Sequence, residues 1–147
     1  MFERIVVGTD GSDTATEAVR QAIQLAKMAG GKLHIVAAFE PIPQTRLREE
    51  QAELPGDVSH IVGPREDVNA ILDTAVGHAK QEGVDADSYP REGDPADAIL
   101  DVAEEINADV VVVGNKGMTG AKRFLLGSVP NKVSHHAPSS VYIVRTT

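Results

Sequence analysis

The chain has 147 residues, of which 41% are hydrophobic and 24% charged, a composition typical of a folded globular protein. It has no cysteine, which excludes a disulfide framework, a thiolate nucleophile, a zinc finger and an iron–sulfur cluster. A net charge of −8, with only three Phe, two Tyr and no Trp, argues against nucleic acid as a partner, because phosphates attract cations and bases stack on rings. Apolar runs reach only about five residues and no signal peptide is recognisable, so we expect a cytoplasmic protein.

The first part of the chain predicts a strand, a helix and a second strand. Residues 4–8 form a short run rich in β-branched residues, with apolar side chains at both odd and even positions. This pattern is typical of a parallel strand covered on both faces. Apolar residues spaced three and four apart over residues 15–29 predict an amphipathic helix, with Ser12 or Thr14 as its cap. A further bulky run predicts a strand over residues 33–38.

The middle of the chain is less regular. Residues 39–63 show no clear periodicity, and we expect a short exposed helix over the charged residues 46–53. Pro64 then begins an amphipathic helix that Gly83 ends. A weak strand is predicted over residues 85–89.

The last part of the chain predicts two more helices and two more strands. Asp94-Pro95 is a helix start, with a capping aspartate followed by proline at the first helical position. Four consecutive valines over residues 110–113 predict a buried strand, and a glycine-bearing segment follows. Another helix is expected near Ser128, and residues 141–144 form a last apolar strand.

Strands and helices therefore alternate along the whole chain. Parallel neighbours need crossover connections, and helices supply them. The pattern predicts an α/β fold, a single five-stranded parallel sheet with helices on both faces, in one domain over residues 1–147.

Small and polar residues follow two of the predicted strands. The first group is Thr9-Asp10-Gly11-Ser12, and the second runs from Gly114-Asn115-Lys116-Gly117 to Gly127-Ser128. Open parallel sheets bind ligands beyond the carboxyl ends of their strands, and N–H groups at a helix start favour phosphate. Thr119, Lys122 and Arg123 add donors and charge to the second group. Neither a G-x-G-x-x-G motif nor a P-loop is present.

Each of these features also has a purely structural interpretation. Glycines after a strand mark turns, Asp10 and Ser128 can cap local structure, and Lys122 and Arg123 can be a solvated face. His135-His136 is not expected to bind a metal, because neighbours on a helix point about 100° apart and no third ligand is evident. The other histidines are isolated and are expected on the surface or in packing: His34, His60 and His78.

The spacing Gly114-x2-Gly117-x9-Gly127-Ser128 resembles that of the nucleotide-binding members of the universal stress protein family. The resemblance extends over essentially the whole chain, and four further segments carry it: residues 5–12, Gly93-Asp94-Pro95, Ala108-Asp109 with the valine run, and residues 125–129. It implies a Rossmann-like fold of the adenine nucleotide alpha hydrolase-like type. It also implies an adenine nucleotide as ligand, either ATP, AMP or cyclic AMP, with Mg²⁺ as an optional companion.

The resemblance also implies roles for individual residues. Asp10 would bond the ribose hydroxyls, the backbone of Ala38 would meet the adenine edge, and Val113 would line the ribose side. Lys116 stands where many relatives carry arginine or histidine, so it keeps a charge but lacks the bidentate fork. The phosphates would meet Gly117, Gly127, Ser128 and Val129. The complete predicted set of nucleotide-binding residues is Thr9, Asp10, Ala38, Val113, Gly114, Lys116, Gly117, Gly127, Ser128 and Val129.

The function implied by the resemblance is that of a stress-response sensor or regulator. No catalytic residue is assigned, because hydrolysis needs a positioned base and Mg²⁺ ligands, and Asp10 is the only obvious carboxylate near the glycines. Two alternatives stay open: an interaction module of the same fold that binds no nucleotide, and a slow ATPase or autophosphorylating enzyme. The family also implies a homodimer that pairs Val141 to Val144 of two copies at a sheet edge.

Overall fold

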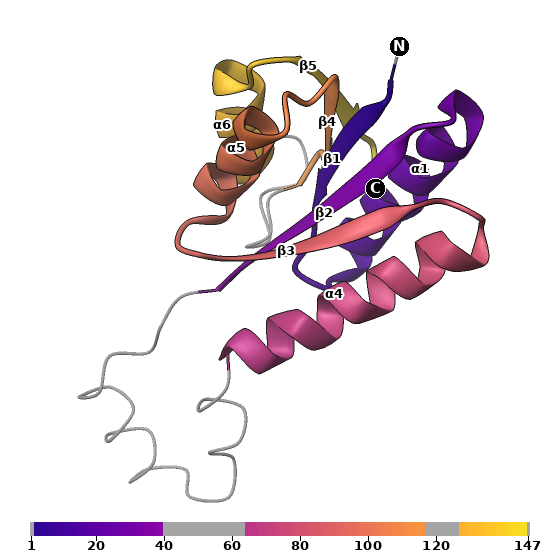
Figure 1. Cartoon of the computed structure of the whole chain (residues 1–147). Helices are drawn as coiled ribbons and strands as arrows, with labels where there is room; N and C mark the ends of the chain where they lie inside the picture. Colours follow the sequence, from indigo (N-terminus) through magenta and orange to yellow (C-terminus); the bar gives the residue numbers. More distant parts are fainter. Residues whose placement is uncertain (1, 40–63, 117–126, 147) are drawn as a thin grey trace, which may run out of the picture.

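The computed structural model describes residues 2–39, 64–116 and 127–146, and its elements alternate as predicted (Figure 1). The helix expected over residues 46–53 lies outside the described residues. In chain order the elements are β1 (Arg4–Gly8), α1 (Asp13–Ala29), β2 (Lys32–Phe39), α4 (Pro64–Gln81), β3 (Ala86–Glu92), α5 (Pro95–Glu105), β4 (Val110–Gly114), α6 (Ser128–His136) and β5 (Ser140–Val144).

The five strands form one parallel sheet in the order β3-β2-β1-β4-β5, which confirms the predicted fold class. The chain extends from β1 to β2 and β3 on one side, and later to β4 and β5 on the other. Ile5 of the central strand is thus paired with Leu33 on one side and with Val110 on the other. Strand order reverses between β1 and β4, and open sheets bind ligands outside the carboxyl ends of strands at such a point.

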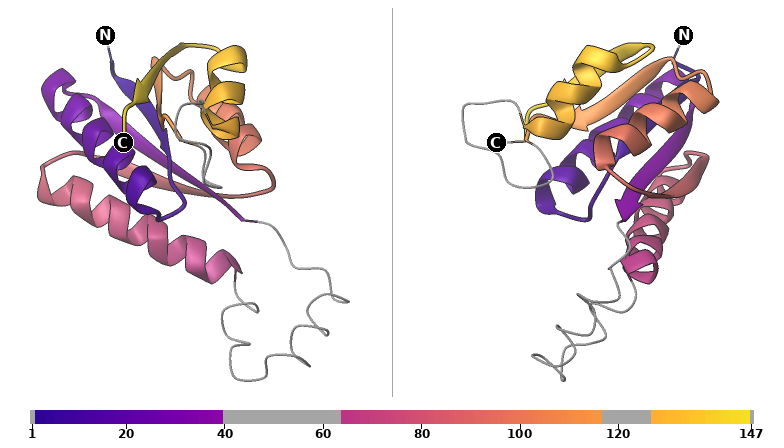
Figure 2. Two further views of the ribbon diagram at one scale, coloured as in Figure 1. Left: turned by 180° about the vertical axis from the view of Figure 1, so that it is seen from behind. Right: turned by 90° about the vertical axis from the view of Figure 1, so that its left-hand side faces the viewer.

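Helices cover both faces of the sheet, and each face has its own core. Helices α1 and α4 lie on one face, and α5 and α6 lie on the other (Figure 2). Ile5 and Val7 of β1 pack toward α1 and α4, whereas Val6 between them packs toward α5 and α6; all three are 0% exposed. Burial on both faces explains why the strand is apolar at every position.

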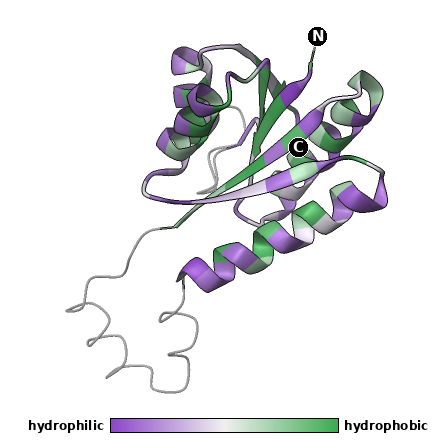
Figure 3. Cartoon of the chain, viewed as in Figure 1, coloured by the Kyte–Doolittle hydropathy of each residue, from purple (hydrophilic) through white to green (hydrophobic). Residues whose placement is uncertain are grey.

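The outer strand β3 is longer than the prediction over residues 85–89, since it continues through Pro90 to Glu92. Proline has no N–H to donate, and a sheet edge is where strands tolerate it. Pro90 lies opposite Ala37 of β2, the strand with which β3 pairs. Hydrophilic residues dominate β3, which Figure 3 colours mostly white to purple.

The starts of α1 and α5 follow the predicted capping chemistry. Ser12, rather than Thr14, is the N-cap of α1, and its hydroxyl oxygen accepts a hydrogen bond from the N–H of Ala15 at 3.2 Å. Asp94 caps α5 by accepting from the N–H of Asp97 at 3.1 Å. Over the described ranges, no helix has both the length and the apolar character that a bilayer crossing requires.

Candidate functional site

The turn after β1 holds the carboxylate of Asp10 by local hydrogen bonds. Thr9 continues the strand ladder, since its N–H donates to the carbonyl of Val36 at 2.9 Å. The Asp10 Oδ1 atom accepts from the N–H of Ser12 at 2.9 Å. Asp10 therefore does form the turn, as its structural interpretation predicted. A carboxylate has two oxygens and about four acceptor positions, so this bond leaves it able to accept from a ligand.

Gly11 lets this turn lie directly against α4. Its φ is +82°, in the left-handed region that favours glycine, and a Cβ there would lie 3.0 Å from the Cδ1 and Cγ1 atoms of Ile71. Thr9 Oγ1 also accepts from the Gly11 N–H at 3.1 Å. The conformation of the turn that carries Asp10 thus depends on a glycine at this position.

Asn115, directly after β4, joins three segments of the chain. Its N–H donates to the carbonyl of Val144 at 2.8 Å, and its carbonyl accepts from the N–H of Gly127 at 3.1 Å. Its side-chain Oδ1 accepts from both the N–H and the hydroxyl of Thr146, at 2.9 and 2.8 Å. Sequence reasoning did not assign Asn115 a role. A polar amide between glycines at the end of a strand was the available signal, but nothing local pointed to Thr146.

The start of α6 has N–H groups without a side-chain cap. Gly127 is the N-cap, with φ −63° and ψ 164°, and no side chain bonds to the first turn. The structural interpretation of Ser128 as the cap is therefore wrong: Ser128 is the first helical residue, and it is exposed. First-turn N–H groups have no partner inside a helix and, with the helix dipole, favour an anion.

The sheet order brings most of the predicted residues to one edge. Asp10 follows the central strand β1, which has Ala38 near the end of β2 on one side and Gly114 at the end of β4 on the other. Val113 is only 2% exposed, with its side chain in the core toward α5 and α6, so it has only its backbone to offer a ligand. Lys116 is half-buried. Predicted site residues and donors outside the described residues are Gly117, Thr119, Lys122 and Arg123.

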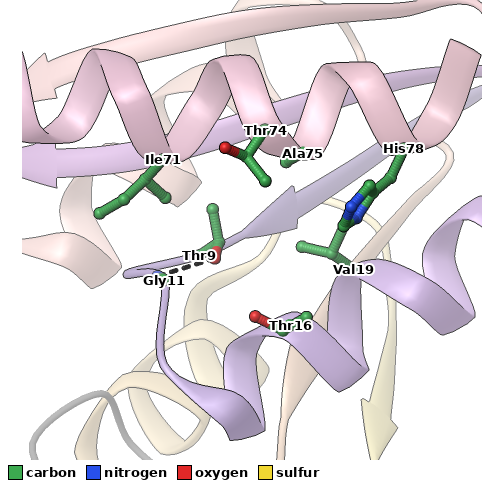
Figure 4. Close-up of a pocket in the computed structure, with 8 residues that line it drawn as sticks. All are labelled: Thr9, Gly11, Thr16, Val19, Ile71, Thr74, Ala75 and His78. Carbon is green, nitrogen blue, oxygen red and sulfur yellow. Dashed lines mark hydrogen bonds between the residues drawn. The ribbon is translucent and has the colours of Figure 1, made fainter.

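A cavity of about 200 Å³ lies between α1 and α4, on one side of the β1 turn (Figure 4). The side chains of Ile71 and His78 from α4 face Thr16 and Val19 from α1, with Thr9 between the helices. Of the predicted nucleotide-binding residues, Thr9 alone among those described lines this cavity. Thr9 is 3% exposed and lines the α1–α4 side, and its N–H is bonded to Val36, so it has its backbone carbonyl to offer at the strand edge.

The described histidines fall into two classes. His34 on β2 is buried and packs against Tyr89, and its burial, with the nearby charge of Lys32, lowers the pKa of its imidazole. His78, His135 and His136 are exposed. In residues 2–39, 64–116 and 127–146, no three or more His, Cys, Asp or Glu side chains gather closely enough to hold a metal ion. His60 lies outside these ranges.

Residues 1–145 match the family model described as universal stress protein family. The chain belongs to the universal stress protein family. The resemblance predicted from the glycine spacing and the strand ends is thereby confirmed.

Relatives of known name or structure cover nearly the whole chain. Universal stress protein Rv1636 of Mycobacterium tuberculosis is 38% identical over 147 residues, which span 99% of this chain and 98% of that protein. Universal stress protein YxiE of Bacillus subtilis is 34% identical over 151 residues, spanning 99% of this chain and all of that protein. A universal stress protein solved in complex with cAMP is 36% identical, with a TM-score of 0.73 and coverage of 99% and 98%. This likeness confirms the Rossmann-like fold.

Proposed function

We propose that this universal stress protein binds an adenine nucleotide at the carboxyl edge between β1 and β4, and acts as a stress-response sensor or regulator. The observation that carries the proposal is the bond from Gly127 to Asn115, which holds the uncapped start of α6 against the end of β4. Val7 of β1 is paired with Val112 of β4. Asp10 lies three residues after Val7, and Asn115 lies three residues after Val112. The carboxylate of Asp10 thus follows β1, and the N–H groups at the start of α6, which favour an anion, lie at the end of the neighbouring strand β4. The 36% identical relative in complex with cAMP supports the ligand class.

In this proposal the turn after β1 contacts the ribose, and the start of α6 beside the end of β4 contacts the phosphate. Asp10 accepts from the ribose, where cyclic AMP offers one free hydroxyl and AMP or ATP offers two. The backbone N–H groups of Ser128 and Val129, with the exposed Ser128 hydroxyl, meet the phosphate. The backbone of Ala38 meets the adenine edge, and Gly114 lines the ribose side. Lys116 and Gly117 complete the set, and Mg²⁺ accompanies ATP if the triphosphate is bound.

The proposed activity is binding rather than turnover, by the whole chain as one domain. Adenine nucleotides are abundant ligands inside cells, so a cytoplasmic place of action is part of the proposal. A binding panel of ATP, AMP and cyclic AMP, with and without Mg²⁺, tests it by calorimetry, together with mass spectrometry of any nucleotide released from the denatured protein. We expect one site per chain for at least one of the three. No binding of any of them would contradict the proposal.

Substitutions at two glycines distinguish an effect on nucleotide binding from an effect on the fold. Gly127→Val places a branched side chain at the buried start of α6 and is expected to weaken binding at least about tenfold, since it fills space beside the phosphate position. Gly77→Ala is the control, because a Cβ at Gly77 on α4 meets no atom within 4 Å. Circular dichroism of both variants reports the fold. Unchanged binding by the Gly127 variant would place the ligand elsewhere.

We also propose that two copies pair through β5. This strand lies at the sheet edge, and Tyr142 and Ile143 on it are 41% and 36% exposed. An edge strand with free backbone groups and exposed apolar side chains favours addition of another strand. A two-fold axis would pair β5 with its own copy, which gives a closed dimer.

A further inference from the structure

The hydrogen-bonded pair Asn115 and Thr146 lies at the junction of β4, β5 and α6. We infer that these two residues position the phosphate end of the nucleotide site, so that the chain following β5 is part of the frame of that site. The inference rests on the proposed function and goes beyond it, because neither residue belongs to the predicted nucleotide-binding set.

The side chain of Asn115 is held in one orientation by Thr146. Both donors of Thr146, its N–H at 2.9 Å and its hydroxyl at 2.8 Å, reach the same Oδ1 atom. An amide oxygen has two lone pairs, so these two bonds use its acceptor capacity fully. Both residues are half-buried, which limits the competition of water for these bonds.

The orientation of Asn115 in turn determines where α6 begins. The N–H of Asn115 continues the β4–β5 ladder to Val144, and its carbonyl receives the N–H of Gly127. The carbonyl of Gly127 then accepts from the N–H of Asn131 at 2.9 Å, which is the first hydrogen bond of α6. A peptide that rotates at Asn115 would misalign the bond to Gly127, and hydrogen bonds weaken steeply with misalignment. Thr146 therefore acts on the helix start through Asn115.

Thr146 also packs beside the glycine at the end of β4. A Cβ added to Gly114 would lie 3.4 Å from the Thr146 Cγ2 atom and 3.7 Å from the carbonyl oxygen of Thr14 near the start of α1. The methyl group of Thr146 thus occupies the space next to Gly114, toward α1. Thr146→Val would keep this methyl, so the packing beside Gly114 on the proposed ribose side stays in place in that variant.

The pair acts on one end of the nucleotide and leaves the other untouched. Gly127 and α6 are at the proposed phosphate end, whereas Ala38, at the proposed adenine end, lies on β2 with β1 between it and β4. Loosening the pair should therefore weaken AMP and cyclic AMP, which carry phosphate, more than adenosine, which carries none. A general loss of structure would weaken all three alike.

Calorimetry with AMP, cyclic AMP and adenosine on the full chain tests this difference. Asn115→Ala removes both side-chain bonds and is expected to weaken the phosphate-bearing ligands about tenfold, with adenosine changed less than about twofold. Thr146→Val keeps the methyl and the N–H but loses the hydroxyl, so about threefold is expected. Ser139→Ala is the matched control, because the Ser139 hydroxyl bonds to Ser140 at the opposite end of β5 and its loss should change nothing.

Thr146→Val decides the test if Asn115→Ala does not fold by circular dichroism. An equal loss for AMP and adenosine would overturn the inference, because it would show a merely structural role. Unchanged affinity for AMP and cyclic AMP in the variants would also overturn it, while binding by the unaltered protein would leave the proposed function standing. No binding of any ligand by the unaltered protein would overturn both.

Discussion

The Nδ1 atom of His34 lies 2.8 Å from the hydroxyl oxygen of Tyr89, and this contact joins β2 to the edge strand β3. His34 is 6% exposed, and its Nε2 atom is buried without a hydrogen-bond partner in the described part of the chain. Burial, and next the charge of Lys32, lower the pKa of His34 below its ordinary value of 6.5, against a smaller opposing effect of Asp87 and Asp85. A proton on this ring is therefore better tolerated in the unfolded chain than in the folded one.

His34 should make the protein less stable in mild acid. Because its pKa is lower in the folded state, the contribution of His34 to the free energy of unfolding is fully present above pH 6.5 and is lost as the pH falls below that value. Urea unfolding at pH 7.5 and at pH 5.5 measures the fall. His34→Gln removes the titration and should flatten it, while His135→Gln, on an exposed histidine, should leave it as in the unaltered protein. Parallel pH dependences for the two variants would show that another group is responsible.

Gly11→Ala should destabilise the turn that carries Asp10. The left-handed φ costs an alanine about 1–3 kcal/mol, and its Cβ would press on Ile71. Shortening that neighbour in an Ile71→Ala background should recover part of the loss, because it removes the contact but not the backbone strain. Gly77→Ala provides the comparison, with an expected gain of about 0.5–1 kcal/mol in the middle of α4. Thermal or urea unfolding that shows equal effects at the two glycines would contradict this prediction.

Asp10→Asn should weaken nucleotide binding while leaving the turn intact. Asparagine keeps an oxygen that accepts from the Ser12 N–H, so the free energy of unfolding should change by less than about 0.5 kcal/mol. The charged acceptor for the ribose is lost, and nucleotide affinity should fall about tenfold. Asp10→Ala removes both and should also lower stability by about 1 kcal/mol. Calorimetry and urea unfolding measure the two effects, and wild-type affinity in the Asn variant would exclude Asp10 as a ligand contact.

Ile143→Lys should prevent the proposed pairing through β5. A charge on an edge strand opposes addition of a second strand. Light scattering at micromolar concentration should give the mass of a dimer for the unaltered protein and of a monomer for this variant. Met28→Lys is the control, since Met28 is an 85% exposed hydrophobic residue on α1 and not on the edge strand. A monomeric unaltered protein would dismiss the pairing.

Local chemistry in the amino-acid sequence determined the elements, their order and the edge of the sheet that carries the candidate site. Apolar runs such as residues 4–8 and 110–113 mark strands buried on both faces, and Ser12 and Asp94 cap the helices predicted to follow them. These features were predictable because each depends on neighbours only a few residues away along the chain. The turn of Asp10 belongs to the same class.

Only the tertiary structure decided which distant residues meet. The order β3-β2-β1-β4-β5 set β4 beside β1 and allowed Pro90 to continue an edge strand. It also joined Asn115 to Thr146, 31 residues later in the chain, and His34 to Tyr89, 55 residues later. Such contacts form because burial of two apolar faces selects one global packing, and no pattern within a single segment encodes its partner.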